Sequence, residues 1–218
     1  MANGEGTISG YRLNATNGRL SPIAGSPFVT GFPTLNSVAV DPTNRFLYAD
    51  YGVINKNVEG YTINCVTGEL TPIPGSPFST GGSPFGIAFH PSGRFAYFAD
   101  FGGSTVSAFK IDPTNGQLQL IATYPTGTFP VAIAVDPLGK FVYVVNQVSD
   151  NISGYTINPL TGALTPMTGS PFPTETYPAS VAIDPNDRFV YVANQGAANV
   201  SGYTINATTD ALSTLDGG

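Results

Sequence analysis

The sequence predicts an all-β protein assembled from repeated four-stranded antiparallel sheets, and three sets of markers lead to this prediction. One set is an aromatic residue that recurs 50, 48, 46 and 48 residues apart, at Tyr11, Tyr61, Phe109, Tyr155 and Tyr203. A second set opens a turn and recurs 49, 46 and 48 residues apart, at Asp41, His90, Asp136 and Asp184. A third set keeps the spacing of the second, at Tyr48, Tyr97, Tyr143 and Tyr191. A period of this length is typical of a solenoid, a propeller or an array.

Each unit contains two predicted hairpins. The first joins apolar strands such as "SVAVDP" (37–42) and "RFLYAD" (45–50) around an Asp-Pro turn. Proline favours the second position of a type I turn, and Asn or Gly tolerates a positive φ at its end. The second hairpin joins "VEGYTIN" (58–64) and "ELTPIPG" (69–75) around a short Gly-containing turn. Four strands per unit follow.

The inner strands explain why the unit is repeated. "FVYVV" at 141–145 is apolar on both alternating faces, so this strand must be covered on both sides. Sheets packed face to face meet that need, and this is the arrangement of a β-propeller. We therefore predict a single propeller domain over residues 1–218. Its parts are a leading two-stranded half blade at 6–24 and four complete blades at about 36–80, 83–128, 129–175 and 177–214.

The string "GSPF" recurs at 25–28, 75–78 and 169–172. Proline cannot donate to a strand ladder, so we expect this string to mark the exit from one blade to the next. Phe28, Phe78 and Phe172 are expected to fill the seams between blades.

Composition excludes several classes of function. The chain is 41% hydrophobic, which is enough for a core, but only 10% charged. A net charge of −6 without a basic run argues against nucleic-acid binding. The apolar runs are too short to span a membrane. No export signal is visible in the sequence. However, low charge with abundant Thr, Ser, Asn and Gly is typical of secreted or cell-surface proteins. Cys65 is the single cysteine, so we expect no disulfide framework, and no cofactor or metal motif is recognised.

The repeated pattern, as in "VAIDPNDRFVYVANQ" (181–195) followed by "VSGYTIN" (200–206), resembles the YVTN-type repeats of the lactonase β-propeller family, whose members include 6-phosphogluconolactonase-like proteins. The resemblance covers nearly the whole chain and implies a ring of seven blades, whereas we count four complete ones. The chain is therefore a piece of a longer propeller, or chains associate to close the ring, or four blades close as a compact monomer.

The resemblance also implies catalytic groups: a histidine pair before one Asp-Pro turn, and a glutamate after the "YVxN" of a later strand. The histidine positions correspond here to Thr34 and Asn36, Ser83 and Phe85, Phe129 and Val131, or Tyr177 and Ala179. The glutamate position corresponds to Tyr51, Phe101, Gln147 or Gln195. A lactonase needs a positioned base and a stabilised oxyanion. We therefore expect this chain to be no enzyme by itself, unless further blades hold the missing groups.

Candidate binding residues end the second strand of successive units, at Asp50, Asp100, Asn146 and Asn194. In a propeller these loops share one face, where such a ring could hold Ca²⁺ or sugar hydroxyls. Alternatively, each side chain caps its own turn, which we favour. Gln147, Gln195 and Tyr177 are expected on the same face and complete the predicted ligand-binding set, with Tyr51, Phe101 and Phe129 beside them. The ligand would be a carbohydrate or a peptide.

The other polar markers have structural interpretations. His90 is the only histidine and replaces the turn aspartate of the other units, so we expect it to hydrogen-bond within its turn. The basic residues that follow this turn are expected to pair with the turn aspartate or with carbonyl groups. They are Arg45, Arg94, Lys140 and Arg188.

Three functional hypotheses follow. The first is a non-catalytic propeller module that binds a ligand or a protein and self-associates, as a homodimer, to close its ring. The alternative is a lactonase-like sugar-lactone hydrolase, degenerate or split between chains, which would lose activity when Asp50 or Asp100 is changed. The third is a fragment of a longer propeller without a function of its own.

Overall fold

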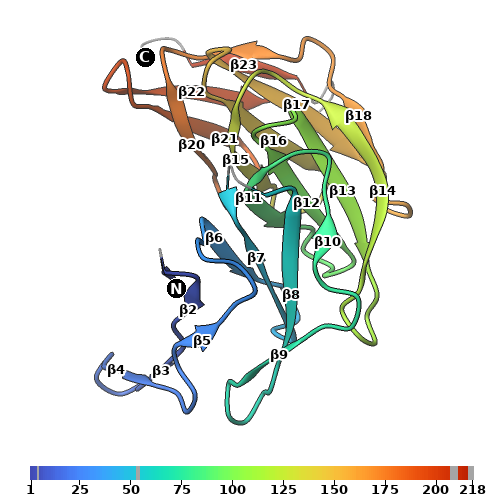
Figure 1. The fold of residues 1–218 in the computed structure, drawn as a ribbon. Helices are drawn as coiled ribbons and strands as arrows, with labels where there is room; N and C mark the ends of the chain where they lie inside the picture. Colours follow the sequence, from blue (N-terminus) through green and yellow to red (C-terminus); the bar gives the residue numbers. More distant parts are fainter. Residues whose placement is uncertain (4, 53–54, 207–210, 216–218) are drawn as a thin grey trace.

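The computed structural model describes residues 1–3, 5–52, 55–206 and 211–215. In this part of the chain the strands fall into five consecutive units of antiparallel sheet, β1–β5, β6–β10, β11–β14, β15–β19 and β20–β23. Figure 1 shows the units following one another in an arc, with the first unit at one end and the fifth at the other. Among the described residues, no helix is long and apolar enough to cross a membrane. The all-β prediction is confirmed.

The first unit comprises β1 (Ala2–Asn3), β2 (Thr7–Ile8), β3 (Tyr11–Leu13), β4 (Leu20–Pro22) and β5 (Phe28–Val29). The second comprises β6 (Ser37–Val40), β7 (Phe46–Asp50), β8 (Asn57–Ile63), β9 (Leu70–Pro72) and β10 (Phe78–Ser79). The third comprises β11 (Pro84–Phe89), β12 (Phe95–Asp100), β13 (Thr105–Ile111) and β14 (Leu118–Pro125). The fourth comprises β15 (Pro130–Val135), β16 (Phe141–Asn146), β17 (Asn151–Ile157), β18 (Leu164–Pro166) and β19 (Phe172–Pro173). The fifth comprises β20 (Pro178–Ile183), β21 (Phe189–Asn194), β22 (Asn199–Ile205) and β23 (Leu212–Thr214).

The "GSPF" string lies inside the outer strand of a unit instead of leading out of it. In the second unit, β9 and β10 both pair with β8, with Phe78 opposite Val58. In the fourth unit, Phe172 likewise lies opposite Ile152. The expected exit was therefore wrong: the proline interrupts the ladder and the phenylalanine resumes it. The third unit lacks the string, and its outer strand β14 runs unbroken along β13.

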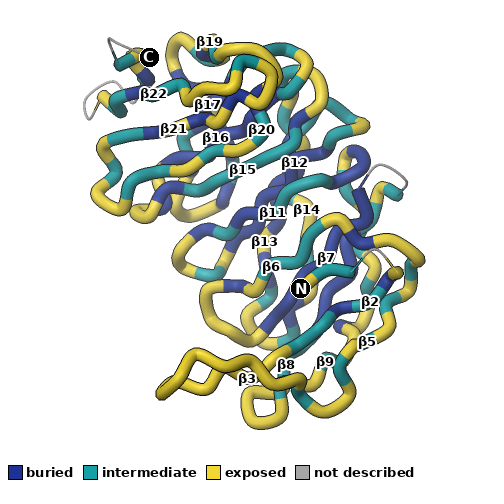
Figure 2. The backbone as a smooth tube through the Cα atoms, turned by 90° about the vertical axis from the view of Figure 1, so that its left-hand side faces the viewer, coloured by how far each residue is buried: buried dark blue, intermediate teal, exposed yellow. Residues whose placement is uncertain are grey.

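The first unit is larger than the two-stranded half blade predicted at 6–24. The hairpin of β3 and β4 is joined by a small sheet in which β2 lies between β1 and β5. Every residue of β3 and β4 is exposed, and Figure 2 shows this hairpin at the edge of the molecule.

Apolar clusters fill the junctions between successive units. In β7, β12 and β16 every residue is buried, because their two faces pack against the units on either side. Phe172 and Phe78 contribute to two of these clusters, as expected for seam residues. In β21 of the fifth unit, burial alternates along the strand. This alternation indicates that only one face of the fifth unit is covered.

Candidate functional site

The units have two chemically different ends. At the turn end lie the Asp-Pro turns and the turns that join the third and fourth strands of each unit. At the mouth end, the second strands β7, β12, β16 and β21 finish and the loops to the next inner strands begin. Since each second strand runs between the two ends, its last residue always lies at the mouth end.

The turn end is held by buried side chains that satisfy backbone groups. Asp136 accepts hydrogen bonds from the N–H groups of Lys140 at 2.6 Å and Phe141 at 2.5 Å, and Asp41 repeats this arrangement. His90 accepts a hydrogen bond from the Ser92 N–H at 3.1 Å through Nδ1 and reaches the Gly139 carbonyl at 3.0 Å through Nε2. Burial lowers the pKa of His90. The structural interpretation of His90 is confirmed.

Three of the four basic residues of the turn end, Arg45, Arg94 and Arg188, pair as expected. Arg45 donates to the Pro113 carbonyl at 2.7 Å, and Arg94 donates to the Pro159 carbonyl. Arg188 forms an ion pair of 3.5 Å with Asp184. Arg45 and Arg94 thus join neighbouring units, whereas Arg188 forms its ion pair within the fifth unit.

At the mouth end, the structure places the four strand-ending residues in buried hydrogen-bond networks within their own units. Asn146 donates to Asn151 Oδ1 at 2.7 Å and to Ser153 Oγ at 2.9 Å. Asn194 does the same with Asn199 at 2.9 Å and Ser201 at 2.8 Å. Asp50 accepts a hydrogen bond from Ser37 Oγ at 2.5 Å. These contacts run to side chains on neighbouring strands; among the described residues, a contact of the expected capping kind is the Gly52 N–H donating to Asp50 Oδ1 at 3.4 Å. The capping and ligand roles of the four residues both stay predictions.

Among the four strand-ending residues, Asp100 is the carboxyl group with an unsatisfied oxygen, while Asn194 at the equivalent position of the fifth unit also has an amide oxygen without a partner. Asp100 Oδ2 accepts hydrogen bonds from Ser107 Oγ at 2.6 Å and Thr105 Oγ1 at 3.1 Å, but the buried Oδ1 of Asp100 has no hydrogen-bond partner. Unsatisfied buried oxygens are rare, and each calls for an explanation such as strain, a bound water or ion, or a catalytic role. Asp100 therefore combines full burial with one free acceptor position.

Gly81 and Gly82 lie against the Asp100 side chain, Gly103 packs on both of them, and Gly102 lies against Ser83. We call these four glycines the glycine cover. A Cβ added at Gly81 would lie 3.1 Å from Asp100 Oδ2, and one at Gly82 would lie 2.4 Å from the Gly103 nitrogen. Side chains could not fit in this arrangement, so glycine lets the backbone approach the carboxyl group closely. Small residues of this kind are also common where a loop must move.

Burial changes the acidity of both mouth-end carboxyl groups. It raises the pKa of Asp50 to about 6, against the opposing effect of the hydrogen bonds from Ser37 and Asn36. It also raises the pKa of Asp100, against the hydrogen bonds from Ser107 and Thr105. In both cases desolvation penalises the charged form more than the donors stabilise it. A carboxylate whose pKa is raised is a stronger base than an exposed one.

Three phenylalanines form an aromatic row beside Asp100: Phe85, Phe101 and Phe129. The ring centroids of Phe85 and Phe101 are 5.5 Å apart, and Phe101 stacks on Phe129 at 4.3 Å with 20° between the planes. Phe129 is 40% exposed, so the row reaches the surface. Phe129 belongs to the fourth unit and the other two to the third, which makes the row continuous across a junction.

Of the remaining residues predicted to line the mouth, three lie on this face and one, Tyr51, does not. Tyr177 is exposed, as is Gln195, whose N–H donates to the Tyr177 carbonyl at 2.9 Å. Gln147 is half-buried and its N–H bonds to the Phe129 carbonyl in the same way, at 2.9 Å. Tyr51 does not line this face, because it is buried in the junction between the first and second units.

Sequence reasoning missed one further acidic side chain, Glu59. It is buried, accepts hydrogen bonds from the Gly31 N–H at 3.0 Å and 3.3 Å, and is bonded to the Tyr61 hydroxyl. The sequence feature that could have pointed to Glu59 is that "VEGY" has glutamate where the other units have serine. The corresponding Ser107 accepts a hydrogen bond from the Gly81 N–H, so Glu59 and Ser107 play the same structural role in their units.

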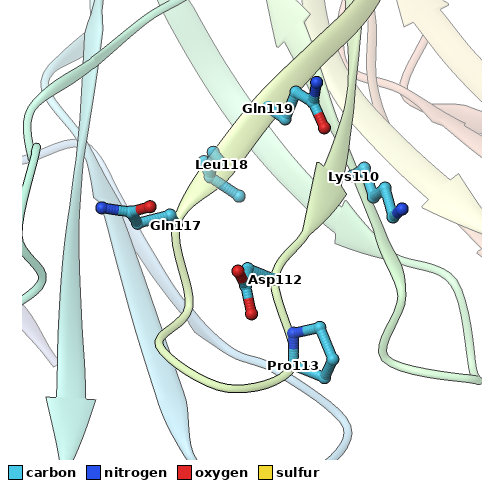
Figure 3. A pocket seen from close by; sticks show the side chains of 6 residues that line it. All are labelled: Lys110, Asp112, Pro113, Gln117, Leu118 and Gln119. Carbon is cyan, nitrogen blue, oxygen red and sulfur yellow. The ribbon is translucent and has the colours of Figure 1, made fainter.

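A cavity of about 390 Å³ lies away from the mouth, at the turn end of the third unit. Figure 3 shows that its lining comes from β13, β14 and the turn between them, with Asp112 and Lys110 on the β13 side. It lacks the buried, unsatisfied group that marks Asp100. We therefore place the candidate site at the mouth end.

The arrangement of the sheets is that of a propeller, and comparisons with known proteins agree. The chain belongs to the lactonase, seven-bladed β-propeller family, whose sequence model matches residues 2–116 and 33–217. The predicted family and the all-β propeller fold are thus confirmed, while the number of blades in the finished ring stays a prediction. No curated protein is significantly similar in sequence.

Solved structures share this fold over nearly the whole chain. A candidate 6-phosphogluconolactonase from Bacteroides uniformis is 21% identical with a TM-score of 0.84, and covers 99% of this chain and 68% of its own. A protein from Lactobacillus plantarum is 24% identical with a TM-score of 0.85, and covers 99% and 66%. The periplasmic gluconolactonase of Pseudomonas aeruginosa is 22% identical with a TM-score of 0.79, and covers 96% and 62%. The chain thus spans about two thirds of the length of these proteins.

Family membership corrects the first functional hypothesis. A non-catalytic binding module was expected because the histidine and glutamate positions hold other residues. The match to the lactonase family over both halves of the chain overturns that hypothesis and favours its alternative, a lactonase-like hydrolase.

Proposed function

We propose that this chain provides the mouth of a lactonase-type propeller that hydrolyses a sugar lactone. Two findings support the proposal: the family to which the chain belongs, and a buried carboxyl group with a raised pKa at the mouth end. The observation that carries it is Asp100, a buried carboxyl group whose Oδ1 has no hydrogen-bond partner and whose side chain Gly81 and Gly82 approach closely. Because no described unit has histidine or glutamate at the family's positions, Asp100 is this chain's own candidate base.

The reaction assigns one role to each part of the site. Water attacks the lactone carbonyl carbon, and Asp100 accepts the proton that the water loses. The bond between this carbon and the ring oxygen then breaks, and Asp100 returns the proton to that oxygen, giving the open hydroxy acid. The aromatic row offers an apolar surface for the face of the sugar ring, and the glycine cover must move to admit it.

The distribution of charge favours an uncharged sugar lactone over a phosphorylated one. Of the eight basic residues, seven lie in or beside the hairpins and turns of the turn end. Lys56, which precedes β8, is the eighth and the one basic residue near the mouth loops. A phosphate group at the mouth would therefore find few cationic partners, and basic side chains are the usual partners of phosphate.

The test is the initial rate of lactone hydrolysis by the purified chain, above the spontaneous rate in buffer, with glucono-δ-lactone and 6-phosphogluconolactone. We expect turnover with a preference for the unphosphorylated substrate. Asp100→Asn should lower the rate by about 10²- to 10⁴-fold, as expected for removal of a general base. The amide fits the site, because Asn146 and Asn194 occupy the same position in sister units with serine partners.

Asp112→Asn is the matched control, since it makes the same change of charge in the same unit but at the turn end. It should hydrolyse the lactone at the wild-type rate. A wild-type rate equal to that of buffer would overturn the proposed function. A rate of Asp100→Asn equal to that of the wild type would remove Asp100 from the mechanism.

A further inference from the structure

Two successive junctions, from the second unit to the third and from the third to the fourth, use one set of contacts. From the unit nearer the N-terminus, a second-strand tyrosine and a turn arginine reach the turn between the third and fourth strands of the next unit. Tyr48 donates to the Gly116 carbonyl at 2.7 Å, while Arg45 donates to the carbonyls of Pro113 at 2.7 Å and Thr114 at 3.4 Å. Together these contacts clamp the turn of the next unit.

The next junction along the chain repeats the contacts. Tyr97 donates to the Gly162 carbonyl at 3.1 Å and Arg94 donates to the Pro159 carbonyl. In both junctions the guanidinium also lies over the ring of the following phenylalanine, at 5.0 Å for Arg45 and 5.1 Å for Arg94. The clamp therefore occurs at two successive junctions.

The fifth unit presents the clamp without a turn to hold. Arg188 lies 5.1 Å over the ring of Phe189, as in the other units, and its side chain is 63% exposed. Tyr191 is 40% exposed, whereas Tyr48 and Tyr97 are fully buried. Val200 is 54% exposed, although its counterpart Val106 is fully buried. We call these four residues, Arg188, Phe189, Tyr191 and Val200, the docking face.

The first unit presents a turn without a clamp. In its β3–β4 hairpin, Tyr11 is 43% and Leu13 is 62% exposed, while their counterparts Tyr155 and Ile157 are buried. The glycine of this turn, Gly18, also lacks the neighbours that its counterparts Gly116 and Gly162 have. A Cβ at Gly116 or Gly162 would meet the phenylalanine of the preceding unit, but one at Gly18 would meet nothing within 4 Å. We call residues 11–20 the docking hairpin, which lies at the edge of the molecule in Figure 2.

We propose that the docking face of one copy binds the docking hairpin of a second copy of this chain. Tyr191 would then donate to the Gly18 carbonyl of the second copy, and Arg188 would donate to the carbonyls of Ala15 and Thr16. Phe189 would pack on Gly18, and Tyr11 and Leu13 would become buried. The second copy is the occupant because the two surfaces are the two halves of a contact that this chain already makes twice internally.

The interface is heterologous, because the two partners use different surfaces. Such contacts build a ring where the rotation closes and an open row where it does not. The exposed apolar side chains of the docking face and the docking hairpin favour this association, because the contact would remove them from water. The inference does not depend on lactone hydrolysis, and it would extend the arc of inner strands that borders the mouth.

Light scattering coupled to size exclusion, across a dilution series, tests the proposal with two variants. Tyr191→Lys spoils the docking face and Leu13→Lys spoils the docking hairpin; both side chains are exposed, so the fold should persist. The wild type should gain mass with concentration, and each variant alone should stay a monomer. Mixed together, the two variants retain one intact face and one intact hairpin, so they should form a dimer and nothing larger.

Leu138→Lys is the control, because Leu138 is 60% exposed but lies in a turn of the fourth unit. It should associate like the wild type. A wild type that stays monomeric at every concentration would overturn the proposal and leave further units of a longer chain as the occupant. Association of the wild type with a monomeric mixture of the two variants would also overturn it, because the contact would then not be heterologous.

Discussion

The packing of a turn glycine against the preceding unit can be tested by one pair of substitutions, Gly116→Ala and Gly18→Ala. Both glycines occupy the same place in the repeat and have positive φ angles, +77° for Gly116 and +71° for Gly18. An alanine in this conformation costs about 1–2 kcal/mol at either position. The two differ in their neighbours. A Cβ at Gly116 would lie 2.5 Å from Phe46 Cδ1 and 2.7 Å from Ile73 Cδ1, while Gly18 has open space.

The expected difference follows from this clash. Both neighbours of Gly116 lie in a buried cluster, so they have little room to move, and overpacking of this kind costs about 1–3 kcal/mol. Gly116→Ala should therefore lower the free energy of unfolding by about 1–3 kcal/mol more than Gly18→Ala. Urea unfolding followed by circular dichroism measures both, at protein concentrations low enough to keep the chain monomeric. Equal destabilisation with unchanged m-values would refute the argument that the turn is clamped by the preceding unit.

Three further outcomes are expected. Burial raises the pKa of Asp50 to about 6, so the contribution of Asp50 to stability is present below about pH 4 and is lost as the pH rises through 6. Between those limits the free energy of unfolding of Asp50→Asn should rise relative to that of the wild type by up to about 3 kcal/mol. A pH-independent difference in urea midpoints would contradict this. Asp136→Ala should cost about 1–3 kcal/mol, because the buried Phe141 N–H loses its acceptor; thermal unfolding would show no change if that bond were unimportant. Tyr97→Phe should cost about 1 kcal/mol by leaving the Gly162 carbonyl without its donor, and a cost no larger than that of an exposed Tyr11→Phe would count against the clamp.

The fold could largely be predicted from the sequence, because equivalent residues recur at regular spacing and must occupy equivalent positions in each unit. The regular spacing of Tyr48, Tyr97 and Tyr143 predicted equivalent strands, and the structure buries all three in the same register. The apolar second strands predicted sheets covered on both faces. The course of "GSPF" was misread, because a proline shows only that a ladder is interrupted. Whether the strand resumes afterwards depends on the partner strand, here β8 or β17.

The site was less readable, because its features depend on distances between units. Asp100 and Asp50 were singled out by position, but their difference lies in the partners of each oxygen. The Gly52 N–H donates to Oδ1 of Asp50 at 3.4 Å, while nothing bonds Oδ1 of Asp100. The aromatic row joins Phe101 to Phe129 across a junction, and no sequence spacing within one unit encodes that stacking. Gly82 and Gly103 depart from the repeat, whereas Gly81 and Gly102 have counterparts in Gly31 and Gly52.

Comparing the initial rate of glucono-δ-lactone hydrolysis by the wild type with that of Asp100→Asn tests the central claim most directly. The account predicts a wild-type rate clearly above the spontaneous reaction and a loss of about 10²- to 10⁴-fold in the variant, with its fold intact by circular dichroism. Spontaneous rates for both proteins would contradict the assignment of this chain to lactone hydrolysis.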